Sequence, residues 1–173
     1  GYSPFSTWTR GQAWILCGFA EELEFLAALD EGAMPKGKKK AEVLSHFVAT
    51  AEAVADHYIE QTPLDGIPYW DTGAPGLASM GDIPGRPADP FNAHEPVDSS
   101  AAVIAAQGLI RLGLYLQQHG KKDQGTVYLQ AGLTVAKSVF SEPYLSLDPK
   151  HQGLILHSVY HRPNGWDHNQ KEK

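Results

Sequence analysis

Cysteine is almost absent from this chain. Its 173 residues include one, Cys17, so no disulfide can form within the chain. Disulfides are rare in the cytoplasm, and their absence fits that compartment without excluding the periplasm. Cys17 lies among apolar residues in a segment with helical periodicity, where an unpaired cysteine usually packs as a small core residue. We therefore predict a core role for Cys17 and leave the compartment open between cytoplasm and periplasm.

Positive charge and long apolar runs are also scarce. Lys and Arg number 14 against 20 Asp and Glu, which gives a formal net charge of −6. Such a balance disfavours nucleic acid, whose binding proteins carry basic surfaces. The longest apolar stretch, residues 13–20, ends at an acidic cluster and is far shorter than the roughly 20 residues that cross a bilayer. We therefore expect neither a nucleic acid partner nor a membrane span.

Three familiar catalytic motifs are missing as well. The chain has no Gly-rich phosphate loop, no G-x-S-x-G nucleophile elbow and no Cys–His pair in a nucleophile context. These absences disfavour P-loop nucleotide hydrolases, α/β-hydrolases and cysteine-dependent enzymes. Chemistry must therefore come from other residue types.

What the chain does contain is helical periodicity. Apolar residues recur at i, i+3, i+4 and i+7 in segments that we place at about residues 10–29, 41–61, 101–116 and 123–140. Pro63 ends the second segment, and Asp98 or Ser99 caps the third. Gly108 and Gly113 inside the third segment indicate a close approach of helices. The sequence predicts an all-α fold.

The helices are organised as a repeated hairpin. Residues 51–59 and 132–140 share a weak internal similarity, and each lies at the end of an outer-looking helix. The first and third helices are rich in Ala, Gly and buried-type apolar residues, which is typical of inner helices. Four such helices would make about a third of a twelve-helix toroid, although repeated hairpins also form open solenoids.

A long proline-rich segment separates the hairpins. Residues 63–97 hold seven of the twelve prolines. Unstructured loops beyond roughly 12–15 residues are uncommon in compact domains unless they are functional or disordered. The segment includes Trp70, Asp71 and Glu95, and we interpret it as an active-site or interface loop. The alternative is a tolerated surface insertion, above all for residues 80–93.

The first fifteen residues carry the clearest chemistry. Trp8 and Trp14 flank Arg10, with Gly11 and Gln12 between them, just where the first helix begins. Unpaired N–H groups and the helix dipole favour an anion there. A guanidinium can hold a carboxylate by two parallel hydrogen bonds, and an indole can cover the C–H face of a sugar ring. The pattern predicts a site for an acidic sugar; the alternative is a Trp-rich helix start packed in a core.

These residues also carry a resemblance to a known family. Residues 7–14, T-W-T-R-G-Q-A-W, resemble the W-x-R-G-Q-A-W segment of unsaturated glucuronyl hydrolases, the glycoside hydrolase family 88 type. The resemblance continues at G-I-P-Y-W-D (66–71), E-P-V-D-S-S-A-A (95–102) and H-S-V-Y-H-R-P-N-G (157–165). It implies part of an (α/α)6 barrel. We expect residues 1–173 to form a single domain that is a C-terminal fragment of a larger catalytic domain, with the remainder of the barrel as its partner.

The resemblance also implies an activity. Such enzymes release a 4,5-unsaturated uronic acid from lyase-generated oligosaccharides by hydrating its double bond, with an aspartate as general acid and base. In the family this aspartate precedes the W-x-R-G-Q-A-W segment, so we expect it upstream of Gly1 and do not transfer its role to Asp71, Glu95 or Asp98. Related rhamnogalacturonyl hydrolases share the barrel, and Gln12-Ala13 favours the glucuronyl type.

Four residues are the expected substrate-binding set. By resemblance, Arg10 would bind the uronate carboxylate or a nearby acidic group, Trp14 would stack on the sugar, and Trp8 and Gln12 would shape the pocket. Because the chain is acidic overall, such a site must be locally positive. The alternative from another class is a non-catalytic helical-repeat module that binds a partner along its inner face.

The histidines near the C-terminus give a weak metal signal. His151, His157, His161 and His168 lie close together, but their spacing matches no strong zinc motif. His157 and His161 would share a face only on a helix, and Pro163 disfavours one. We expect loop histidines that hydrogen-bond the backbone or a sugar, and no metal or organic cofactor.

Overall fold

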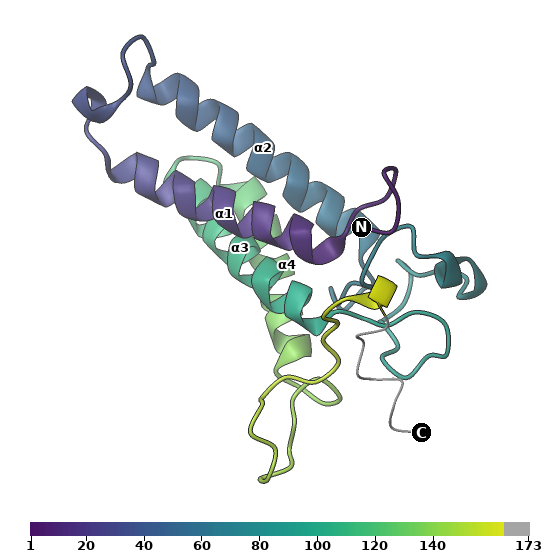
Figure 1. Ribbon diagram of the computed structural model, residues 1–173. Helices are drawn as coiled ribbons and strands as arrows, with labels where there is room; N and C mark the ends of the chain where they lie inside the picture. The colour runs from purple at the N-terminus through teal and green to yellow at the C-terminus, as the bar shows by residue number, and fades with distance from the viewer. Residues whose placement is uncertain (165–173) are drawn as a thin grey trace.

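The structure, a computed structural model, describes residues 1–164 and is built from four long helices (Figure 1). They are α1 (Thr9–Ala28), α2 (Lys40–Gln61), α3 (Ser99–Gln118) and α4 (Lys122–Val139), with short 3-10 helices at Glu31–Ala33, Pro75–Ser79 and Arg162–Asn164. In this part of the chain β-structure is limited to isolated bridges. The all-α prediction is confirmed, and the predicted helix ends differ from the observed ones only within the usual uncertainty of helix boundaries.

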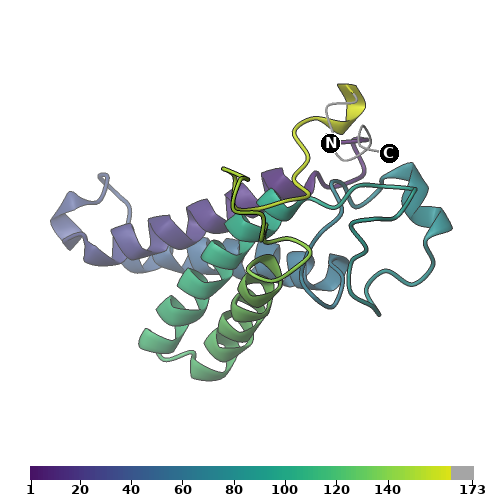
Figure 2. The ribbon, with the colours of Figure 1, turned by 90° about the horizontal axis from the view of Figure 1, so that it is seen from below.

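The helices form two hairpins that pack against each other. α1 contacts both α2 and α3, and α3 also contacts α4, so α1 and α3 are neighbours in the middle of the arrangement. Figure 2 shows the α1–α2 hairpin crossing over the α3–α4 hairpin. The core between them is apolar and rich in alanine; its fully buried helical members include Leu16, Leu23, Ala51, Ala55, Ala101, Ala105, Leu109 and Leu112. The predicted repeated hairpin is present, with the first and third helices side by side.

Glycines allow the close approach that the sequence indicated. A Cβ on Gly108 would lie 2.8 Å from the backbone nitrogen of Cys17, and one on Gly113 would lie 2.6 Å from that of Leu129. Real Cβ atoms do not come so near to backbone. Gly108 therefore sets the spacing of α3 against α1, and Gly113 that of α3 against α4. Cys17 itself is half-buried, and burial together with the Glu21 carboxylate raises the pKa of its thiol.

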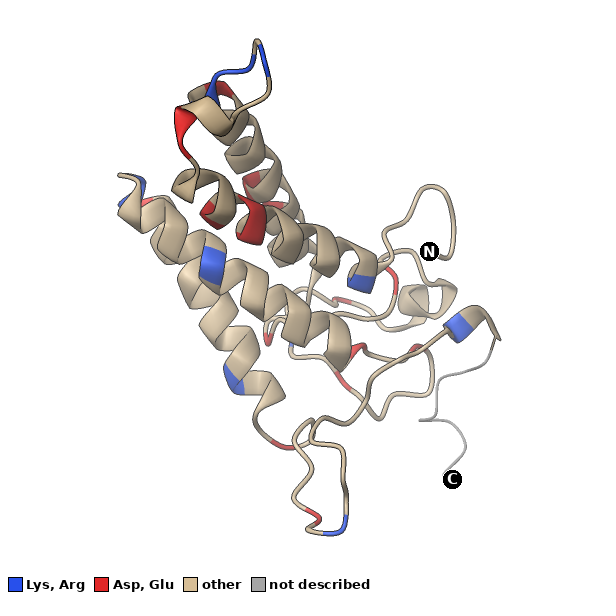
Figure 3. Cartoon of the chain, turned by 60° about the vertical axis from the view of Figure 1, so that its left-hand side comes forward, with Lys and Arg blue, Asp and Glu red and all other residues tan. Residues whose placement is uncertain are grey.

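The lysine-rich connection lies at the end of the molecule away from the N-terminus (Figure 3). Lys38 and Lys39 are exposed, whereas the ammonium group of Lys40 turns back and donates to the carbonyl oxygens of Ala27, at 2.8 Å, and Leu29. These are unpaired carbonyls at the end of α1, where a cation is favourable. The connection is thus an exposed loop that leads directly into the start of α2.

The proline-rich segment gathers at the opposite end, beside the first residues of the chain. Isolated bridges join Trp8 to Asp71 and Tyr69 to Val97. Ile67 and Val97 are fully buried, and Tyr69 and Trp70 are nearly so, so at least this part of the segment belongs to the core. A third isolated bridge joins Leu145 to Ile155.

α3 is long and apolar enough to cross a membrane by length and composition alone. Most of that helix is buried here against α1 and α4, as in the core helix of many proteins. The search for continuous apolar stretches did not detect this helix, because Gln107 and Arg111 interrupt its apolar run. The absence of a membrane span therefore stays a prediction.

Candidate functional site

The starts of α1 and α3 lie side by side, and an ion pair joins them. Arg10 Nε donates to Asp98 Oδ2 at 3.1 Å. Asp98 is fully buried and caps α3, because its Oδ1 accepts the backbone N–H groups of Ser100, at 3.1 Å, and Ala101, at 3.3 Å. The cap was predicted from the sequence; the direct contact with Arg10 was not.

A second connection to Arg10 comes from residues 156–160, which we call the strap. The backbone N–H of Ser99 donates to His157 O at 3.1 Å, so the strap sits on the start of α3. Arg10 Nη2 donates to the carbonyl oxygens of Val159 and, at 3.0 Å, Tyr160. Nε and Nη2 are thereby used inside the protein, and Nη1 makes no hydrogen bond with the described residues. Arg10 therefore cannot use Nε and Nη2 to donate two parallel hydrogen bonds to a ligand carboxylate.

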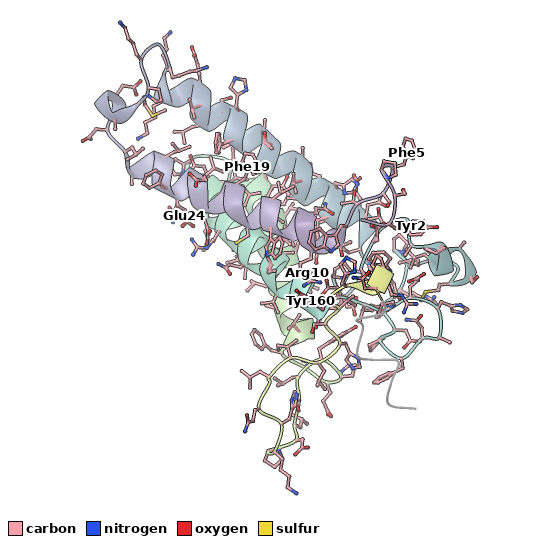
Figure 4. The ribbon with its side chains drawn as sticks, viewed as in Figure 1. Tyr2, Phe5, Arg10, Phe19, Glu24 and Tyr160 are labelled. Carbon is pink, nitrogen blue, oxygen red and sulfur yellow. The ribbon has the colours of Figure 1, made fainter. Side chains whose placement is uncertain are left out.

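A cavity of about 140 Å³ opens next to Arg10, and we call it the rim pocket. The residues that line it come from separate parts of the chain: Gly1, Trp8, Arg10, Trp70, Val159, Tyr160, His161, Arg162 and Pro163. These described lining residues include cationic and aromatic side chains but no Asp or Glu. Figure 4 shows Arg10 and Tyr160 close together at this end, with Tyr2 nearby and Phe5 at the tip of a projecting loop. The pocket therefore presents guanidinium and indole groups, the types of side chain that an acidic sugar would contact.

The second guanidinium of the rim pocket also has a carboxylate beside it. Arg162 Nε lies 3.6 Å from Glu95 Oε2. Glu95 is buried, and its two oxygens accept Trp70 Nε1–H and the backbone N–H of Gly76, each at 2.9 Å. Glu95 therefore holds a wall of the pocket in place without facing into it.

The two tryptophans of the W-x-R-G-Q-A-W segment touch each other, and one of them also lies close to Arg10. The rings of Trp8 and Trp14 are 5.5 Å apart and nearly perpendicular, and the Arg10 guanidinium lies 5.7 Å from the Trp8 ring centre. A Cβ on Gly11 would come within 2.8 Å of the Trp8 ring, so glycine is required there. Trp14 keeps 54% of its surface exposed, which leaves a ring face for a ligand.

Gln12 points in another direction. It is buried, and its Nε2 lies 3.2 Å from Val54 O and 2.9 Å from His57 Nδ1, both on α2. With Trp8 it lines a separate groove of about 520 Å³ between α1 and α2. The four residues named from the sequence thus do not converge on one cavity. Arg10 and Trp8 line the rim pocket, Trp14 contacts Trp8 without lining that pocket, and Gln12 lines the separate groove.

Asp71 supports the turn that follows Trp70. It is fully buried, and its carboxylate accepts the backbone N–H groups of Tyr2, at 2.6 Å, and Gly73, at 2.9 Å. Together with the cap at Asp98 and the clamp at Glu95, this accounts for the carboxylates nearest the site. Each one holds backbone or a side chain of the protein.

The histidines divide between the strap and the pocket. His157 adopts a left-handed φ of 63° and packs between the rings of Phe91 and Tyr144. Its Nδ1 is buried without a partner among the described residues, and burial lowers the pKa of its imidazole. His161 lines the rim pocket, and His168 lies outside the described residues. Within residues 1–164, His, Cys, Asp and Glu side chains form no cluster of three suited to a metal ion.

Comparison with known proteins gives this arrangement a context. No family model matches the chain. A curated unsaturated glucuronyl hydrolase from Formosa agariphila is 28% identical over 173 residues, 99% of this chain and 33% of that protein. The crystal structure of unsaturated glucuronyl hydrolase from Bacillus sp. GL1 superposes with a TM-score of 0.70 at 26% identity, covering 96% of this chain and 36% of that one. The chain resembles about one third of an unsaturated glucuronyl hydrolase.

The resemblance predicted from the four sequence segments is thereby confirmed. The unsaturated glucuronyl hydrolases of known structure are (α/α)6 barrels, and the two hairpins correspond to part of such a barrel. An unsaturated glucuronyl hydrolase variant from Streptococcus agalactiae, crystallised with dGlcA-GalNAc6S, has the same fold, with a TM-score of 0.65 at 23% identity. The chain spans about a third of the length of the curated relatives it matches.

Proposed function

We propose that this chain supplies part of the substrate-binding wall of an unsaturated glucuronyl hydrolase. The whole protein would release a 4,5-unsaturated uronic acid from oligosaccharides made by polysaccharide lyases. The observation that carries the proposal is the rim pocket, which Arg10 lines together with the indoles of Trp8 and Trp70. The proteins with which the chain aligns over nearly its full length are named for this activity.

The chemistry of the pocket suits an acidic sugar. A uronate ring has an apolar C–H face for an indole and a carboxylate for a guanidinium. Since Nε and Nη2 of Arg10 are occupied by the protein, Nη1 is the group that would meet the carboxylate or a neighbouring acidic substituent. Low accessibility strengthens such a contact, and the Arg10 side chain is only 14% exposed.

Each of the four predicted residues has a role within this proposal. Arg10 binds the acidic group, and Trp8 covers the same cavity. Trp14, with its exposed ring, stacks on the sugar. Gln12 does not contact the sugar. Its hydrogen bonds to Val54 and His57 fix the start of α1 against α2.

The proton chemistry is assigned elsewhere. Hydration of the double bond needs a general acid and base. Asp71, Glu95 and Asp98 are all buried and hydrogen-bonded to protein groups, and none lines the rim pocket. We therefore assign the catalytic aspartate to a part of the enzyme other than residues 1–164, within a larger barrel of which this chain is one piece.

The alternative function is a non-catalytic helical-repeat module. An aromatic, cationic cavity without a carboxylate would suit such a binding module as well as a hydrolase. The similarity to enzymes over nearly the whole chain favours the hydrolase. Turnover by the complete protein decides between them.

The test uses Trp14→Ala in the complete protein with an unsaturated chondroitin disaccharide, following the loss of ultraviolet absorbance of its double bond. Removing about 1–2 kcal/mol of ring contact should raise KM roughly 5- to 30-fold. Phe25→Ala is the matched control, since Phe25 is an equally exposed aromatic (58% against 54%) farther along α1. No turnover by the unmodified protein would favour the binding module, and equal KM values for the two variants would remove Trp14 from the site.

A further inference from the structure

We propose that Asp98 is a positioning residue for catalysis: it fixes the guanidinium of Arg10 so that Nη1 faces the rim pocket. The inference rests on the proposed function, because positioning matters only if Arg10 binds substrate. It goes further in giving the α3 cap a second task, one that no pattern in the sequence assigns to it.

Asp98 is suited to this task because its carboxylate has a separate oxygen for each role. Oδ1 accepts the hydrogen bonds that cap α3, and also that of Ser100 Oγ. Oδ2 accepts Arg10 Nε–H. The side chain is fully buried, so water does not compete for either oxygen.

The backbone of Asp98 is itself anchored. Its N–H donates to Pro68 O at 2.8 Å, and the preceding residue, Val97, bridges to Tyr69. The carboxylate therefore cannot follow Arg10 if the arginine moves. Arg10 must adapt to Asp98, which is the property expected of a positioning group.

Asp98 also acts on Arg10 through the strap. The backbone N–H of Val159 lies 3.4 Å from Asp98 Oδ1, while the carbonyl of Val159 accepts from Arg10 Nη2. Two donors of the guanidinium are thus held by groups that both depend on Asp98. The plane of the guanidinium is fixed as a result, and so is the direction of Nη1.

An amide at this position would separate the two roles. In Asp98→Asn, a single oxygen can keep the cap, but the NH2 group then faces Arg10 Nε–H, donor against donor. The helix start is retained and the guanidinium is displaced. A misplacement of about 1 Å in a binding group can cost up to roughly 100-fold in rate.

The test is a double-mutant cycle on the complete protein with the unsaturated disaccharide. Asp98→Asn should lower kcat/KM about 10- to 100-fold, and the same change in an Arg10→Ala background should lower it no further. Asp71→Asn is the matched control: an equally buried, backbone-bonded carboxylate without a guanidinium, whose effect should add to that of Arg10→Ala. Additive losses for Asp98→Asn would overturn the positioning role while leaving Arg10 in the site; full activity of Arg10→Ala would overturn both proposals.

Chemical rescue separates positioning from a purely structural role. Added methylguanidinium should restore part of the activity of Arg10→Ala, because the Asp98 carboxylate remains to seat it, and should fail in the double variant Arg10→Ala/Asp98→Asn. Equal rescue of both would contradict the proposal. Should Asp98→Asn fold poorly, Asp98→Ser replaces it, since serine also caps a helix but does not reach Arg10.

Discussion

At the level of single residues, Arg10 shows how neighbours decide what a charge can do. From the sequence it is a guanidinium with five N–H donors beside two indoles. In the structure Asp98 and the strap occupy Nε and Nη2, and the outward chemistry is reduced to one amino group. The candidate site thus combines the Arg10 guanidinium, which lines the pocket, with the buried Asp98 carboxylate that holds it.

His157 leads to a prediction about pH. Burial lowers the pKa of its imidazole in the folded protein, so the folded state stays neutral where the unfolded chain, with the ordinary value near 6.5, takes up a proton. The unfolded state then binds more protons, and stability falls as pH drops through that range. Asparagine tolerates the left-handed backbone at this position. In His157→Asn, the free energy of unfolding of the 173-residue chain, measured in urea, should therefore decrease less between pH 7 and pH 5 than in the unmodified chain.

The control for this prediction is His46→Asn. His46 is exposed on α2, and its replacement should leave the pH dependence as it is in the unmodified chain. A dependence that persists in His157→Asn would assign the proton uptake to another group.

At the level of elements, the contact between α1 and α3 depends on a missing side chain. In Gly108→Ala the new Cβ would meet the α1 backbone at Cys17, so the helices must separate. We expect a loss of about 1–3 kcal/mol in the free energy of unfolding, as for other overpacked cores. Chemical denaturation of the 173-residue chain measures it, as a lower midpoint at unchanged slope.

Gly18 on α1 provides the opposite case. A Cβ there meets nothing within 4 Å, so Gly18→Ala should gain helix propensity, about 0.5–1 kcal/mol, without a clash. The two substitutions are chemically identical and should differ in sign. If both stabilise the chain, the close approach at Gly108 is not what holds α3 against α1.

At the level of the whole molecule, the length of the chain relative to its relatives limits what it can do alone. The chain covers about a third of the length of its curated relatives, and it leaves the rings of Trp14 and Phe25 exposed on the first hairpin. The (α/α)6 barrels that it resembles are about three times as long. Under the proposed function, residues 1–173 would supply only part of the wall of a substrate site.

We accordingly expect the purified 173-residue chain not to hydrolyse unsaturated disaccharides, while the complete protein does. The pocket described here lacks a carboxylate to move protons, and its carboxylate neighbours are occupied. The ultraviolet assay on both preparations measures the difference. Turnover by the shorter chain would mean that an acid lies within it, with Asp71 the first to replace by asparagine.

The sequence by itself determined the helices and the family resemblance. Helical periodicity, prolines and the cap at Asp98 are local signals, because they depend on residues only a few positions apart, and they placed all four helices correctly. Gly108 and Gly113 indicated close packing for the same reason. The segment around Arg10 supplied the candidate site residues, since a short motif carries its residue types and spacing together.

Only the tertiary structure decided how those residues are used. Arg162 and Tyr160 reach the pocket through the strap, some 150 positions after Arg10, and Asp98 reaches Arg10 across 88 positions. No local pattern encodes such pairings, because they arise from the packing of one hairpin on the other. For the same reason, the sequence could not show that Gln12 turns toward α2 or that only one amino group of Arg10 remains for a ligand.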